Sequence, residues 1–187
     1  MKESPRFGWL EVITGCMFGG KSEELIRRVR RVAIAQQAVA VFKPEIDTRY
    51  GVNVVASHSC QKLDATPIPC ADPGRIVKML PEEIDVVAID EAQFFSESLV
   101  DVCESLSRRG LRVIVAGLDQ DSRGKPFGPM GHLLAIADHV KKYPAICTVC
   151  GMEATKSQRL LPNPDEQIEV GAADKYAARC RRHHTPG

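Results

Sequence analysis

A glycine-bearing segment near the N-terminus has the spacing of a phosphate-binding loop. Residues 15–22 are Gly-Cys-Met-Phe-Gly-Gly-Lys-Ser, which matches the pattern G-x-x-x-x-G-K-[ST]. Glycines let backbone N–H groups curl around phosphate oxygens, and the N-terminus of the following helix adds its positive dipole end. Lys21 can then reach the β- and γ-phosphates of a nucleotide, and the Ser22 hydroxyl can bind Mg²⁺. The alternative is a glycine-rich turn followed by a chance Lys-Ser pair.

Two adjacent carboxylates follow an apolar stretch at residues 86–89. In proteins with a phosphate loop, an aspartate at such a strand end holds Mg²⁺, which assigns that role to Asp90. Consecutive strand residues point to opposite faces, so Glu91 is free for a different task. We expect Glu91 to act as a general base on the group that attacks the γ-phosphate. The alternative is that the acids cap the next helix.

Two pairs of metal-ligand residues lie near the C-terminus. Cys147 and Cys150 form a C-x₂-C pair, and Cys180 and His183 form a C-x₂-H pair. Two such pairs complete a closed tetrahedral site of the structural type, and this donor set suits Zn²⁺. His184 competes with His183 for the fourth position, and the alternative for all of them is free cysteines beside a basic tail.

Strands and helices alternate around these residues. Apolar runs at residues 10–14, 39–42, 85–90 and 111–118 predict strands, and helical spacing predicts helices at 21–33, 75–80, 98–109 and 133–137. Residues 44–74 are expected to be irregular with one or two short strands, and residues 119–131 to form a loop. This order predicts an α/β fold of the P-loop, RecA-like kind, a parallel sheet flanked by helices. We divide the chain into a nucleotide-binding domain, 1–142, and a small zinc-ribbon-like domain, 143–187.

Composition narrows the class of protein. The chain has 187 residues, of which 44% are hydrophobic and 26% charged, so it can bury a core without disulfides. Its seven cysteines are an odd number, which is a poor disulfide framework. The net charge of +1 argues against nucleic acid or a membrane surface as the main partner. No apolar run spans a bilayer and no export signal precedes the first strand, so we expect a cytoplasmic protein.

Four arginines, at positions 27, 28, 30 and 31, lie in the first predicted helix. We expect them on its solvated face, where they pair with Glu23 and Glu24 one turn away. Contact with nucleic acid is the alternative role.

The chain as a whole resembles the type II thymidine kinases over residues 8–184. The segments that carry the resemblance occur in the family's order: 15–22, 42–43, 47–50, 89–95, 125–128, the two metal pairs and 171–176. A phosphate loop alone is weak evidence for any substrate, whereas this ordered set is specific.

The resemblance implies ATP-dependent phosphorylation of the 5′-hydroxyl of thymidine, with Mg²⁺ and a structural Zn²⁺. It implies salvage of deoxynucleotides for DNA synthesis, a homotetramer and inhibition by dTTP, with neither membrane nor nucleic acid as partner. Glu91 matches the family's proton acceptor. The matching ATP-binding positions are Gly15, Cys16, Met17, Phe18, Gly19, Gly20, Lys21, Ser22, Asp47, Thr48, Arg49, Asp90, Ala92 and Gln93. The matching nucleoside-site positions are Met17, Phe94, Leu118, Phe127, Ile168, Glu169, Val170, Gly171 and Tyr176, the last five in a substrate lid.

Two positions depart from the family pattern. Ser122 stands where many relatives have an aromatic residue near the substrate, and Cys16 replaces a common proline. A second hypothesis, from a different class, is a zinc-containing P-loop ATPase that acts on DNA through its metal module and its arginine-rich helix.

Overall fold

A six-stranded parallel sheet forms the centre of the molecule. The computed structural model describes residues 7–48, 51, 53–56, 62–160 and 175–186. Along the sheet the strand order is β5-β2-β6-β7-β1-β8, and each neighbouring pair is parallel. The strands are β1 (Trp9–Thr14), β2 (Val39–Pro44), β5 (Thr66–Ile68), β6 (Val86–Ile89), β7 (Arg112–Gly117) and β8 (His139–Lys142). The expected P-loop α/β architecture is confirmed.

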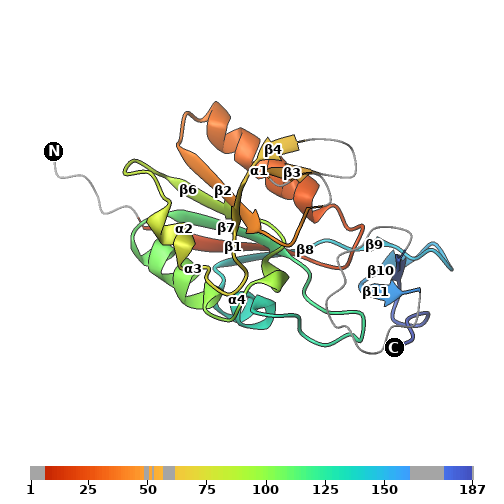
Figure 1. Ribbon diagram of the computed structural model, residues 1–187. Helices are drawn as coiled ribbons and strands as arrows, with labels where there is room; N and C mark the ends of the chain where they lie inside the picture. Colours follow the sequence, from red (N-terminus) through yellow and green to blue (C-terminus); the bar gives the residue numbers. More distant parts are fainter. Residues whose placement is uncertain (1–6, 49–50, 52, 57–61, 161–174, 187) are drawn as a thin grey trace.

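Helices cover both faces of this sheet (Figure 1). Helix α1 (Lys21–Ile34) lies on one face beside a small hairpin of β3 (Val54–Ala56) and β4 (Lys62–Asp64). The other face carries α2 (Arg75–Lys78), α3 (Leu99–Arg108), α4 (Met130–Ile136) and the 3₁₀ turn η1 (Ala92–Phe94). None of the helices in the described ranges is long and apolar enough to cross a bilayer.

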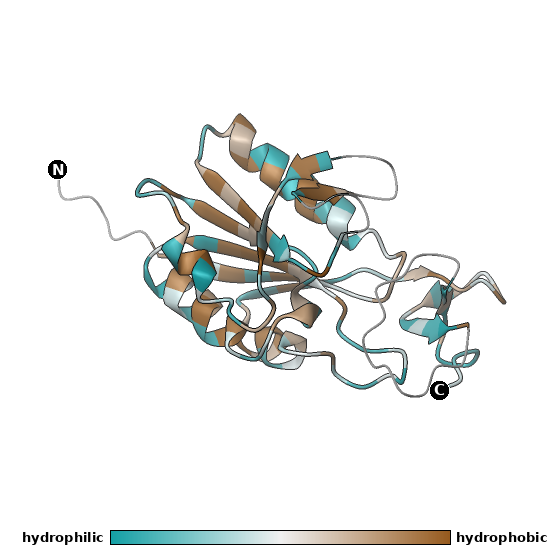
Figure 2. Cartoon of the chain, in the orientation of Figure 1, coloured by the Kyte–Doolittle hydropathy of each residue, from teal (hydrophilic) through white to brown (hydrophobic). Residues whose placement is uncertain are grey.

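Two apolar layers hold the helices on the sheet, and the central strands are mostly brown in Figure 2. Successive residues of β1 point to opposite faces, so Val12 packs toward α3 and Ile13 packs toward α1. Strands buried on both faces need nearly continuous apolar runs. That requirement explains why the strand predictions from sequence agree closely with β1, β2, β6 and β7.

A small module of two-stranded sheets follows the last sheet strand (Figure 1). It comprises β9 (Ala145–Ile146) paired with β10 (Glu153–Ala154), and β11 (Lys156–Arg159) paired with β12 (Tyr176–Arg179). Its buried residues form an apolar cluster around Ala154 and Ala178 that also includes Cys16 of the segment 15–22. We call residues 143–186 the C-terminal module.

Three expectations about local structure were wrong or incomplete. Strand β8 was not predicted, because all four of its residues are exposed and carry no apolar pattern. Helix α4 begins at Met130, within the stretch expected to be a loop, and ends at Ile136. The described residues of the segment 44–74 contain three short strands rather than one or two.

One of the four helix arginines lies inside an ion cluster rather than in solvent. Arg28 bonds Glu24 at 2.8 Å and Glu11 of β1 at 2.6 Å, and its side chain is 16% exposed. Glu11 also accepts hydrogen bonds from Arg112, at 2.7 Å, and from the Trp9 indole. The expected pairing with Glu24 is confirmed for Arg27 and Arg28. The expected place on the solvated face is wrong for Arg28, because its long side chain reaches a buried carboxylate of the sheet.

This ion cluster should make stability depend on pH. Hydrogen bonds from Arg27 and Arg28 outweigh burial and lower the pKa of Glu24 from 4.5 to about 2. A lowered folded-state pKa stabilises the fold above pH 4.5, and that contribution is lost as pH falls toward 2. We expect Glu24→Gln to lower the melting temperature by about 2–4 °C at pH 7 and to have little effect near pH 2. A difference that stays constant across thermal scans from pH 7 to 2 would contradict this assignment.

Candidate functional site

The phosphate-loop segment lies between β1 and α1, as its pattern requires. Gly15 (φ 131°), Phe18 (φ 65°) and Gly20 (φ 78°) adopt left-handed backbone conformations that curl the loop. Helix α1 begins directly after Gly20, whose carbonyl accepts the first helical hydrogen bond from Glu24. The loop therefore presents its N–H groups and a helix N-terminus at one place, which is a suitable site for phosphate oxygens.

The first residue after β8 packs directly against this loop. A Cβ atom on Gly15 would lie 2.1 Å from the carbonyl oxygen of Tyr143, and one on Gly19 would lie 2.5 Å from it. The Tyr143 N–H also donates to the carbonyl of Thr14 at 2.8 Å. The glycines of the loop thus allow it to curl and also let its backbone approach that of Tyr143 closely, because a side chain there would clash.

Two hydrogen bonds tie the loop to the C-terminal module. The Met17 N–H donates to the Ser157 hydroxyl at 3.0 Å, and the Cys16 thiol donates to the Ala154 carbonyl at 3.1 Å. Burial raises the pKa of the Cys16 thiol, which disfavours the reactive thiolate. Cys16 is therefore a packing contact in this structure, and Ser157 is a contact that sequence analysis did not identify.

Ser22 and Asp90 meet although 68 residues separate them. The Ser22 hydroxyl donates to the Asp90 carboxylate at 3.1 Å. Strand β1 precedes Ser22, strand β6 precedes Asp90, and both are parallel to β7, which lies between them. The carboxyl ends of these strands therefore lie at one edge of the sheet, where the two oxygens meet. Hydroxyl and carboxylate oxygens next to a phosphate site are ligands of the kind Mg²⁺ takes, so the donor set fits that ion.

Lys21 lies over the same site. Its ammonium donates to the Cys16 carbonyl at 2.7 Å. Burial lowers the pKa of Lys21, and the nearby Glu91 and Asp90 carboxylates oppose that shift. The cation and the two acids therefore share one environment.

Glu91 follows β6 in a left-handed conformation with φ 50°, which is uncommon outside glycine and asparagine. The Gln93 side-chain amide donates to the Glu91 carboxylate at 2.5 Å. The other end of that amide accepts a hydrogen bond from the Leu118 N–H at 3.0 Å. The proposed base thus has a defined partner at the carboxyl ends of β6 and β7.

The structure brings some of the expected nucleoside contacts together. The rings of Phe94 and Phe127 pack edge to face with centroids 5.7 Å apart. Leu118 lies against the Gln93 amide beside them. Tyr176 lies in β12, where its hydroxyl accepts a hydrogen bond from Arg159 at 3.1 Å.

Several expected positions lie outside the described residues: Arg49, Ile168, Glu169, Val170 and Gly171. Of the neighbouring segment, Asp47 is buried and Thr48 is exposed. Lys43, which is 1% exposed, lies 3.8 Å from Asp47 and donates to the carbonyls of Gly51 and Val54. A buried lysine thus orders the chain on both sides of Arg49.

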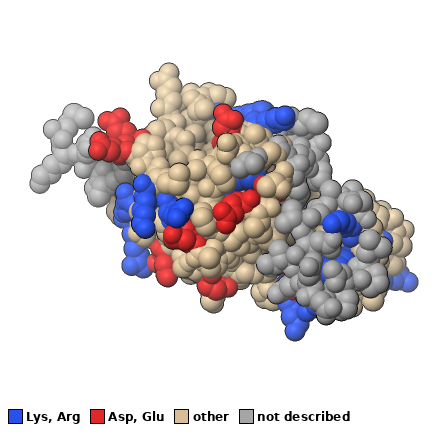
Figure 3. All heavy atoms as spheres, in the orientation of Figure 1, with Lys and Arg blue, Asp and Glu red and all other residues tan. Residues whose placement is uncertain are grey.

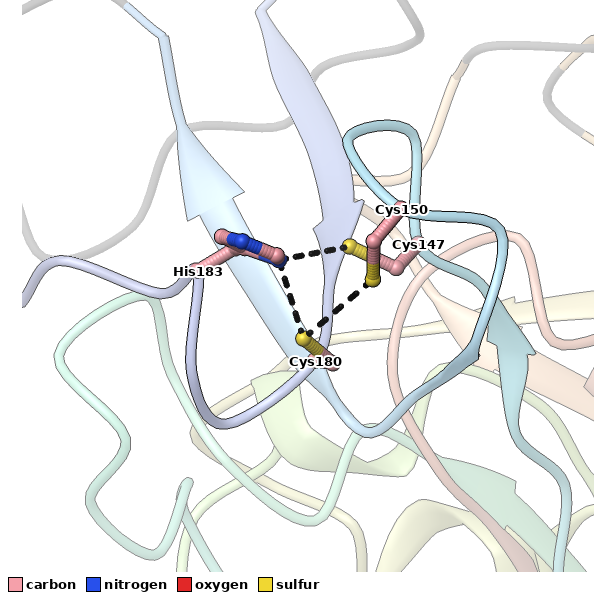
Figure 4. Close-up of side chains that lie close together, drawn as sticks. All are labelled: Cys147, Cys150, Cys180 and His183. Atoms are coloured by element: carbon pink, nitrogen blue, oxygen red, sulfur yellow. Dashed lines mark hydrogen bonds between the residues drawn. The ribbon is translucent and has the colours of Figure 1, made fainter.

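The four predicted metal ligands converge in the C-terminal module (Figure 4). Cys147 and Cys150 lie at the turn after β9, Cys180 and His183 follow β12, and their ligand atoms all lie within 4.8 Å of one another. The sulfurs of Cys150 and Cys180 are 3.8 Å apart. Tetrahedral Zn²⁺ with Zn–S bonds of about 2.3 Å places two sulfurs about 3.8 Å apart, so the geometry fits zinc.

The alternative fourth ligand is excluded by geometry. His184 points away from this cluster, and its Nε2 lies 2.8 Å from the Ser122 carbonyl. Burial raises the pKa of Cys147, but backbone N–H groups, that of Cys180 foremost, outweigh it and lower the pKa to about 5. A thiolate is the form that binds metal.

A buried acid after β7 was not identified from sequence. Asp119 is 6% exposed and pairs with Lys142 of β8. Its other carboxylate oxygen has no hydrogen-bond partner among the described residues. The signal that could have found it is its place at the end of a strand next to the one that carries the phosphate loop.

Comparison with known proteins assigns the family. The family model described as thymidine kinase matches residues 8–184. The chain belongs to the thymidine kinase family. A thymidine kinase from Rhodothermus sp. (strain ITI 518) is 51% identical over 179 residues, which are 96% of this chain and 82% of the relative. The matched range includes the segment 15–22 and the four residues of the metal cluster.

Proposed function

We propose that this protein is an ATP-dependent thymidine kinase that converts thymidine to dTMP. The observation that carries the proposal is the family match over residues 8–184, which spans the phosphate loop, the acidic strand end and the metal cluster. The resemblance seen in the sequence and the curated relative support the same activity.

The described residues suggest how the transfer proceeds. Loop amides and Lys21 would bind the β- and γ-phosphates, and Ser22 with Asp90 would hold Mg²⁺. When bound, the metal neutralises charge on these phosphates. Glu91 accepts the proton of the 5′-hydroxyl as that oxygen attacks the γ-phosphorus. The bond from phosphorus to the bridging oxygen breaks, and ADP leaves.

The finer assignments remain part of this proposal. Residues 1–142 are the kinase domain, and residues 143–187 are a zinc-binding module that carries the substrate lid. The nucleoside site is lined by Met17, Phe94, Leu118, Phe127 and Tyr176, together with residues 168–171. The family resemblance supports a cytoplasmic homotetramer inhibited by dTTP.

The DNA-dependent ATPase gains no support. Arg28, counted among the basic residues for that hypothesis, is engaged with Glu11 and Glu24 inside the fold. On the face seen in Figure 3, acidic and basic side chains of the described residues are interspersed over the sheet domain. A surface with mixed charge does not favour binding of the negatively charged phosphate backbone of DNA.

A nucleoside panel with ATP and Mg²⁺ tests the proposal, with 5′-monophosphate as the readout. We expect thymidine to be phosphorylated and ATP turnover to depend on it. ATP turnover that responds to DNA and not to thymidine would instead establish a DNA-dependent ATPase.

A further inference from the structure

Gln93 lies in the site in a position that its assignment to ATP binding does not explain. Its side chain is almost fully buried, at 2% exposed. Both ends of its amide are engaged within the protein: Nε2 donates to Glu91, and Oε1 accepts from the Leu118 N–H. An amide with both ends occupied in this way is oriented toward the base rather than toward a nucleotide.

The surrounding backbone holds this amide in place. A Cβ atom on Gly117 would lie 2.9 Å from Gln93 Oε1 and 2.7 Å from the Met130 sulfur. A Cβ atom on Gly128 would lie 2.3 Å from the Gln93 carbonyl oxygen. Strand β7 and the loop before α4 therefore approach Gln93 closely on both its side chain and its backbone, which leaves the amide little room to rotate.

We propose that Gln93 is a positioning residue that holds the Glu91 carboxylate against the acceptor hydroxyl. This inference rests on the proposed kinase function. Glu91 stands in an uncommon left-handed backbone conformation after the strand. A glutamate side chain has several staggered rotamers, so a contact is needed to hold its carboxylate in one place. The Gln93 amide selects one of them, and Leu118 fixes which end of the amide faces the acid. An error of about 1 Å in the place of a reacting group costs about 100-fold in rate.

The test is the Gln93→Glu variant, because a glutamate side chain has nearly the same shape as a glutamine side chain. A glutamate still accepts from the Leu118 N–H but has no N–H to donate to Glu91. We expect kcat for thymidine to fall about 10- to 100-fold. We expect the KM for ATP and the affinity for a non-hydrolysable ATP analogue to stay within about threefold, since the loop is untouched. Gln37→Glu, at an exposed position after α1, adds the same charge and should leave kcat unchanged.

A double-mutant cycle separates positioning from a structural or nucleotide-binding role. In a Glu91→Gln background, the Gln93→Glu exchange should cause no further loss of turnover, because the group that Gln93 positions is gone. Losses of equal size with and without Glu91, full activity of the single variant, or a large loss of ATP-analogue affinity would each overturn the assignment. Because Gln93→Glu places a second carboxylate beside Glu91, Gln93→Met serves as the uncharged variant and should lose turnover similarly.

Wild-type protein that fails to phosphorylate thymidine would instead refute the proposed function. In that case, a Glu91 side chain that keeps its place in a crystal structure of Gln93→Met would refute the positioning role on its own.

Discussion

Replacing Glu91 by glutamine is expected to lower thymidine phosphorylation by about 10²–10⁴-fold, the usual contribution of a positioned general base. The amide has nearly the same shape as the carboxylate and can still accept the hydrogen bond that Gln93 donates. It cannot take a proton from the 5′-hydroxyl. The loss should therefore appear in kcat, with ATP binding retained.

Steady-state kinetics with thymidine, together with titration of an ATP analogue, measure the two effects separately. Glu97→Gln is a suitable control, because Glu97 is an exposed acid that pairs with His132 at the protein surface. That variant should match the wild type. Near-normal turnover of Glu91→Gln would refute Glu91 as the base.

Removal of the Zn²⁺ that we propose at the metal cluster is expected to weaken nucleotide binding as well as nucleoside binding. The ligands Cys147 and Cys180 pack in the same apolar cluster as Cys16 and Phe18 of the phosphate loop. Ser157, between the two ligand pairs, also accepts the Met17 N–H. A module that unfolds without its metal therefore withdraws contacts from the loop.

We expect Cys180→Ser, or chelation, to lower the affinity for an ATP analogue by at least about 10-fold, and to increase proteolysis within residues 151–160 and 175–179. Cys70→Ser provides the control, since Cys70 is a half-buried cysteine outside the metal cluster. It should retain one zinc per chain and normal affinity. Unchanged nucleotide affinity and unchanged proteolysis after metal loss would show that the module does not support the loop.

The amino-acid sequence by itself was sufficient for features that depend on local spacing. The phosphate loop, the acids after β6 and the two ligand pairs each lie within a few residues, and the chemistry needs those residue types at that spacing. The buried parallel strands were predictable for a similar reason, because burial on both faces demands apolar runs. Strand β8 has no such apolar run and was not predictable, because its hydrogen bonds to β1 do not require buried side chains.

Only the tertiary structure decided which distant residues meet. Arg28 leaves the solvent because folding places Glu11 beneath it. His183 rather than His184 joins the cysteines, since the loop that contains Ser122 takes the second histidine. Gln93 was recognisable in the sequence only as a member of a family segment. Its orientation toward Glu91 depends on Leu118, which is 25 residues away and beside it only once β6 and β7 pair. Such contacts arise from strand order and packing, which no local pattern encodes.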